Sequence, residues 1–209
     1  MELRRRGHAV ESIDTKVGGA HHDVLRPEVA ERIEARVRAR YFDGVFLATP
    51  CQSFSIAHRP QLRSRAHPLG LPSVPEEWRA YLDKHNRLAA WSARVAHICH
   101  GANVPIMIEN PADRGDESSP AHWPRMADHA PLSRQPDMVA WREETGAKVV
   151  VLAQCEFGAQ WQKYTEVQCS ADILQEAQVR LARRCTHTHH AEHSYGRHAN
   201  GAGKAEQAA

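Results

Sequence analysis

The chain has 209 residues, of which 42% are hydrophobic and 25% are charged, and its net charge is +2 with histidine neutral. These proportions are typical of one globular domain and exclude wholesale disorder. No apolar run approaches the roughly 20 residues of a membrane span, and the N-terminus lacks an apolar signal segment. Five widely spread cysteines argue against a disulfide scaffold. We therefore expect an intracellular protein with no membrane partner, nuclear in a eukaryote and cytoplasmic in a prokaryote or a virus.

The first third of the chain predicts a strand, a helix and a second strand. Residues 8–14 are expected to form a short strand that ends in an acid, Asp14. Apolar residues recur every four positions over about 27–41, which predicts an amphipathic helix. The apolar run at 45–48 lacks alternation and suits a strand covered on both faces. Residues 58–75 are rich in proline, arginine and serine and are expected to form a long loop.

The rest of the chain continues the alternation of helices and strands. We expect helices at about 75–100, 139–145 and 173–184, and strands at 104–108, 148–153 and 164–169. This order predicts an α/β fold with a mostly parallel sheet and helices on both faces.

The C-terminal tail differs in composition from the domain that precedes it. We expect one domain over 1–184 and a poorly ordered tail rich in histidine, glycine and alanine over 185–209. The tail contains several possible metal ligands: Cys185, His187, His189, His190, His193 and His198. Because they crowd one segment with no obvious partner pair, we expect a solvated tail and no metal site. Cys155 and Cys169 are interpreted as strand residues.

Chemically distinctive residues stand where the predicted strands end. In open α/β sheets, ligands bind beyond the carboxyl ends of the strands. Asp14, Cys51 and Glu109 are therefore expected to share one edge of the sheet. Cys51 follows Pro50 in a polar turn, which favours a presented nucleophile over the buried role that is usual for a free cysteine. Glu109 either recognises a base and donates a proton, or only solvates a loop.

The loop after Cys51 is basic. No acidic residue occurs between Asp43 and Glu76, whereas Arg59, Arg63 and Arg65 do occur there. The functional interpretation is a flexible loop that meets phosphates, and the alternative is an ordinary solvated loop.

Several segments resemble motifs of the cytosine-5 DNA methyltransferase family. Residues 49–57, Thr-Pro-Cys-Gln-Ser-Phe-Ser-Ile-Ala, resemble the family's Pro-Cys-Gln-x-Phe-Ser motif, and Glu-Asn-Pro at 109–111 resembles its Glu-Asn-Val motif. Residues 157–165 are similar to a degraded form of its Gly-Val-Pro-Gln-x-Arg-x-Arg motif. The resemblance covers about residues 5–170.

The resemblance implies a Rossmann-like methyltransferase sheet and a reaction on double-stranded DNA whose target cytosine is flipped out. Cys51 would add to C6 of that cytosine, Glu109 would hold the N3/N4 edge, and Lys163 would meet the O2 oxygen. S-adenosylmethionine would be the methyl donor. Its contacts would come from Asp14, Asp23 and Pro50. Contacts to the DNA would come from Ser53, Ser55, Arg59, Arg63 and Arg65.

Two other interpretations remain open at this point. The sequence contains no Phe-x-Gly-x-Gly turn, the family's first motif. This favours a shortened or divergent relative, and an inactive one would bind DNA or a partner without turnover. The other alternative is a cysteine hydrolase in which Cys51 pairs with a histidine such as His58 or His97.

Overall fold

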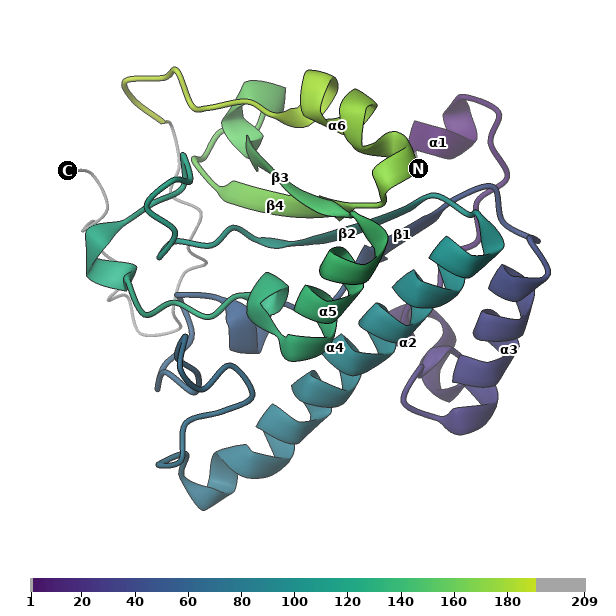
Figure 1. Cartoon of the computed structure of the whole chain (residues 1–209), viewed down its shortest axis with the longest axis horizontal. Coiled ribbons are helices and arrows are strands. Elements are labelled where there is room, and N and C mark those ends of the chain that lie inside the picture. Colours follow the sequence, from purple (N-terminus) through teal and green to yellow (C-terminus); the bar gives the residue numbers. More distant parts are fainter. Residues whose placement is uncertain (1, 191–209) are drawn as a thin grey trace.

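The computed structural model describes residues 2–190 as a layered α/β structure (Figure 1). The helices are α1 (Glu2–Arg5), α2 (Thr15–Gly18), α3 (Pro27–Arg38), α4 (Glu76–Ala102), α5 (Pro136–Thr145) and α6 (Leu174–Leu181). The strands are β1 (Val45–Ala48), β2 (Ile106–Pro111), β3 (Lys148–Ala153) and β4 (Tyr164–Cys169). The predicted helices and strands from residue 27 onward are thus confirmed, with shifts of a few residues at their ends.

The boundaries of the two helices that flank the site follow local chemistry. α4 ends where Asn103 adopts a left-handed conformation with φ 52°, a conformation that asparagine tolerates better than most residues. α5 begins with Pro136 in its first turn, where the missing N–H costs nothing. It ends at Gly146, with φ 73°.

The four strands form one mixed sheet in the order β1-β2-β4-β3. β1 pairs with β2 in parallel, with Ala48 beside Glu109. β4 runs antiparallel to both β2 and β3. The expectation of a mostly parallel sheet is therefore wrong, because β4 joins β3 by a short connection and inserts between β2 and β3. Three strands still point in one direction, and only β4 is reversed.

Helices cover both faces of the sheet, as expected (Figure 1). On one face, α4 and α5 contribute Ala96, Cys99 and Trp141 to a core that includes Ile106 and Ile108 of β2. On the other face, α6 lies over β3 and β4, and its Ala177 packs with Val150 and Val167. α3 packs against α4 rather than on the sheet.

Two expectations near the N-terminus are wrong. Residues 8–14 form no strand, because a strand needs a neighbour for its backbone hydrogen bonds and β1 has β2 as its only partner in the described sheet. Asp14 is therefore not at a strand end. β1 is also not covered on both faces, since Phe46 is 61% exposed.

Part of the expected tail lies outside the described residues, including His193 and His198. The segment 182–190 is described and lies beside the β3–β4 connection. None of the helices in the described range is long and apolar enough to span a bilayer.

Candidate functional site

The turn that carries Cys51 is held from two sides. The Asn110 side-chain amide donates a hydrogen bond to the Thr49 carbonyl at 2.8 Å, which ties the end of β1 to the end of β2. The Thr49 hydroxyl lies 2.8 Å from the Ser92 hydroxyl on α4. His85, also on α4, hydrogen bonds through its ring to the Pro50 carbonyl. The backbone that presents Cys51 is therefore fixed against both the sheet and α4.

Cys51, Glu109 and Lys163 converge at this edge. The sheet register places Glu109 beside Ala48, three residues before Cys51. Lys163, just before β4, has its Nζ atom 3.8 Å from Glu109 Oε1. The charges of both side chains act on the Cys51 thiol, which is partly buried. Three residues from separate parts of the chain thus meet where β1, β2 and β4 come together.

Burial is the main influence on the thiol. It raises the pKa of Cys51 above the ordinary thiol value, Lys163 lowers this pKa, and Glu109 raises it. Cys51 therefore rests as a neutral thiol at neutral pH, and it becomes nucleophilic only when the proton is removed. A ligand that neutralises Glu109 would favour the thiolate.

Asn110 is the residue on which this convergence depends most directly. Replacing Asn110 by alanine should lower the free energy of unfolding by about 1–3 kcal/mol, because the Thr49 carbonyl loses its buried partner. Urea denaturation measures the loss. Ser118→Ala is the control, because it removes a side-chain hydrogen bond at the exposed surface, from the Ser118 hydroxyl to Asp116 at 2.7 Å. An Asn110→Ala protein as stable as the parent would show that the bond does not hold the turn.

The residues expected to bind the cofactor have local structural roles. Asp14 is exposed, and its carboxylate caps α2 by accepting from the Lys16 N–H at 2.8 Å. Asp23 accepts from the Leu25 N–H at 3.0 Å. The Leu25 carbonyl in turn accepts a hydrogen bond from Arg87 of α4. Arg87 lies two residues after His85, which contacts Pro50. Because Arg87 and His85 are two residues apart, they point to different sides of α4, and the 23–25 segment and the Cys51 turn contact different sides of that helix.

The basic loop is packed rather than flexible, which corrects the expectation made for it. Arg63 is 3% exposed. Its guanidinium donates to Asn86 Oδ1 at 2.7 Å and to the buried Ser53 hydroxyl at 3.1 Å, and it lies over the Phe54 ring. Burial lowers the pKa of Arg63 to about 10. Neither Arg63 nor Ser53 is exposed for contact with a DNA backbone.

Arg65 is also engaged within the protein. It donates to both carboxylate oxygens of Asp113, at 2.8 and 2.9 Å, and to the Ala127 carbonyl. Arg134 donates to the same carboxylate at 2.9 Å. Arg59 is exposed and Ser55 is half-buried, so these two residues remain accessible among those expected to bind DNA.

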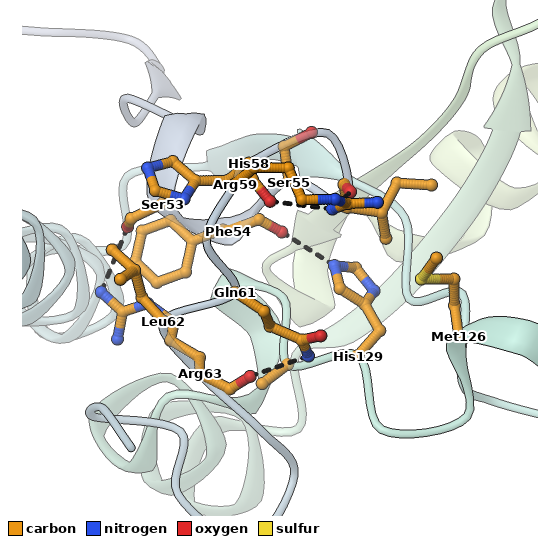
Figure 2. A pocket seen from close by; sticks show the side chains of 12 residues that line it. Ser53, Phe54, Ser55, His58, Arg59, Gln61, Leu62, Arg63, Met126 and His129 are labelled. Atoms are coloured by element: carbon orange, nitrogen blue, oxygen red, sulfur yellow. Dashed lines mark hydrogen bonds between the residues drawn. The ribbon is translucent and has the colours of Figure 1, made fainter. Parts of the chain in front are cut away.

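Figure 2 shows a small pocket beside the Cys51 turn, lined by Ser55, Arg59, Arg63 and His129 among others. His129 closes one side, with its Nε2 atom 2.8 Å from the Phe54 carbonyl. The volume is about 30 Å³, enough for about two water molecules but not for a pyrimidine. Cys51 and Glu109 do not line it, so it is not the expected base pocket.

Sequence reasoning missed the roles of Tyr81 and His85, which lie one helical turn apart on α4. Their rings are 4.5 Å apart, and Tyr81 is close enough to Cys51 for the two to interact electrostatically. Their spacing of four on one helix face was the available signal. His97 is paired with Glu144 at 3.6 Å and stands about 18 Å along α4 from His85. The hydrolase interpretation therefore loses His97 as a partner for Cys51.

Comparisons with protein-family models, with curated proteins and with solved structures found no significant match.

Proposed function

We propose that this protein acts on cytosine in DNA in the manner of a cytosine-5 methyltransferase, with Cys51 as the nucleophile. The observation that supports the proposal most strongly is the convergence of Cys51, Glu109 and Lys163 at the end of β1 and β2. These three residues come from the three segments that resemble the family's motifs.

The chemistry begins with transfer of the Cys51 proton to solvent water. The resulting thiolate adds to C6 of a flipped cytosine, and the electron pair of the C5–C6 double bond moves to C5. Glu109 holds the N3/N4 edge and supplies a proton at N3, which stabilises the adduct. Lys163 faces the O2 oxygen as a point charge. A solvent proton taken up at C5, loss of the original C5 proton, and expulsion of the thiolate as the N3 proton returns to Glu109 regenerate cytosine.

S-adenosylmethionine would supply the methyl group that takes the place of the C5 proton. The residues described do not form a complete pocket for it. The carboxylate of Asp14 caps α2, residues 8–14 form no strand, and β1 has no described partner on its outer side. Thiol addition is therefore the part of the reaction that this chain's own residues supply.

Two readouts test the proposal separately. In deuterated water, the full chain should exchange the C5 proton of cytosine in duplex DNA without any methyl donor, and Cys51→Ser should abolish the exchange. With S-adenosylmethionine added, a covalent adduct between Cys51 and DNA that contains 5-fluorocytosine, detected by mass spectrometry, would show that the chain also binds and uses the methyl donor. Cys99→Ala is the matched control, since this thiol lies buried in the core.

The outcomes also separate the alternatives. Exchange without an adduct would limit this chain to base binding and thiol addition. DNA binding with neither exchange nor adduct would contradict the enzymatic proposal and support an inactive relative that binds nucleic acid.

A further inference from the structure

Four side chains of the types that can bind metal ions, from two segments distant in the sequence, meet beside the β3–β4 connection. Cys155 lies in the short helical turn Gln154–Phe157 that follows β3. Cys185, His187 and His190 lie in the segment after α6. One ligand atom from each residue lies within 4.8 Å of the others. The sequence could not show this cluster, because Cys155 was interpreted as a strand residue and the other three lie in the expected tail.

The spacing of these atoms is close to that of a tetrahedral zinc site. Bonds of about 2.3 Å to sulfur and 2.0–2.1 Å to nitrogen at tetrahedral angles place sulfur and nitrogen about 3.6 Å apart. The Cys185 sulfur lies 3.3 Å from His190 Nε2 and 3.9 Å from His187 Nδ1. Small side-chain rotations therefore suffice to coordinate an ion.

Bonds around the cluster hold its two segments together. Glu156 Oε1 accepts from the Thr186 N–H at 2.8 Å and from its hydroxyl at 2.9 Å. The same oxygen lies 3.2 Å from His187 Nδ1, the ring nitrogen that faces the Cys185 sulfur, so Glu156 holds this imidazole beside the cluster and gives way to the ion at that nitrogen. The Cys185 N–H donates to the Tyr164 hydroxyl at 3.3 Å.

We propose that Cys155, Cys185, His187 and His190 bind one zinc ion. Two thiolates and two imidazoles form a soft ligand set that favours zinc over magnesium or calcium. Four protein ligands leave no position for substrate, so the ion is structural. It joins the segment that follows α6 to the connection between β3 and β4.

The site also lies next to Lys163. The side chain of Gln162 is within hydrogen-bonding range of the Cys185 sulfur, and Lys163 is the next residue. Zinc therefore restrains the loop between Gly158 and Lys163. Its removal should increase the mobility of this loop without affecting the core of α4.

The test measures metal content in the full-length chain. Purified protein dialysed against trace zinc should retain one zinc ion per chain. Cobalt(II) in its place should give the intense visible absorption of a tetrahedral site with thiolate ligands. Cys155→Ser, Cys185→Ser and His190→Gln should each reduce the zinc content at least fivefold. His189→Gln is the matched control, because this exposed histidine lies in the same segment but outside the cluster.

Hydrogen–deuterium exchange provides a second readout on the unmutated chain. Treatment with a chelator should increase exchange in 154–163 and 182–190 and leave the α4 core unchanged. Zinc retention that is lost in His190→Gln but unchanged in Cys155→Ser would overturn the proposal, since it would mean that the histidine-rich segment binds metal alone. Octahedral cobalt spectra, equal loss of zinc in His189→Gln, or a Cys155–Cys185 disulfide in place of bound metal would overturn it as well.

Discussion

Replacing Glu109 by glutamine should speed the alkylation of Cys51 by iodoacetamide and slow the exchange of the cytosine C5 proton. The two effects have opposite signs because Glu109 acts on two different steps. Its negative charge raises the pKa of the thiol, so its removal increases the thiolate fraction, by about threefold to tenfold. Its carboxyl group is also the proposed proton donor at N3, and its loss should slow exchange by about 10²–10⁴-fold.

Replacing Lys163 by glutamine should slow both reactions. Lys163 lowers the pKa of Cys51, so without it this pKa rises and less thiolate is present at a given pH. In the parent protein, alkylation should continue to accelerate as the pH rises beyond the ordinary thiol pKa, because burial has raised the pKa of Cys51. Mass spectrometry of the Cys51 peptide measures the rate separately from the other thiols.

Glu144→Gln serves as the control for both variants, since Glu144 pairs with His97 at the distant end of α4. Equal alkylation rates in Glu109→Gln, Lys163→Gln and the parent would show that the two charges do not act on the thiol. Faster alkylation together with undiminished exchange in Glu109→Gln would show that Glu109 does not take part in the reaction with the base.

Replacing Glu166 by glutamine should stabilise the protein at pH 8 but not at pH 4.5. Glu166 lies on β4, is 1% exposed, and accepts from the Asp113 N–H at 3.2 Å. Burial raises the pKa of this carboxyl from 4.5 to about 7. Because the folded state keeps the proton that the unfolded state loses, the stability that the protonated form contributes falls as pH rises between these two values.

The size of the stability loss between pH 4.5 and pH 8 follows from the raised pKa of Glu166. The pKa of Glu166 in the folded protein lies about 2.5 above its ordinary value, and this difference corresponds to about 3 kcal/mol in the free energy of unfolding. Glutamine has the shape of the protonated carboxyl but does not titrate, so Glu166→Gln should avoid this loss. Urea denaturation of the parent and the variant at both pH values measures it, with Glu176→Gln, an exposed residue of α6, as the control. A difference between variant and parent that is the same at pH 4.5 and pH 8 would contradict the assigned protonation of Glu166.

The positions of the helices and strands could be predicted from the sequence because their signals are local. The four-residue recurrence of Val29, Ile33 and Val37 depends only on helix geometry, and it matches α3. The apolar runs that form β1 and β3 can likewise be recognised from their own residues alone. The prediction failed before residue 27: residues 8–14 form no strand, because a strand exists only where another strand accepts its hydrogen bonds, and the short helices α1 and α2 were not predicted.

The candidate site could be predicted only in part. Cys51 and Glu109 stand at strand ends, and the ends of neighbouring parallel strands meet at one edge, so their proximity followed from the order of elements. Arg63 and Arg65 misled the sequence analysis, since composition shows that a loop is basic but not which groups neutralise it. Asp113 neutralises Arg65 from a position 48 residues away, and Asn86 binds Arg63 from a helix that begins after the loop.

The sequence by itself determined the helices and strands from residue 27 onward and the chemical types of Cys51, Glu109 and Lys163. The tertiary structure decided that β4 runs antiparallel to its neighbours, that Arg63 is buried and Arg65 is paired with Asp113, and that Cys155 meets Cys185 beside the β3–β4 connection. The reason is physical: periodicity and turn chemistry act over a few residues, whereas strand pairing, ion pairing and ligand clustering depend on contacts between segments that only packing brings together.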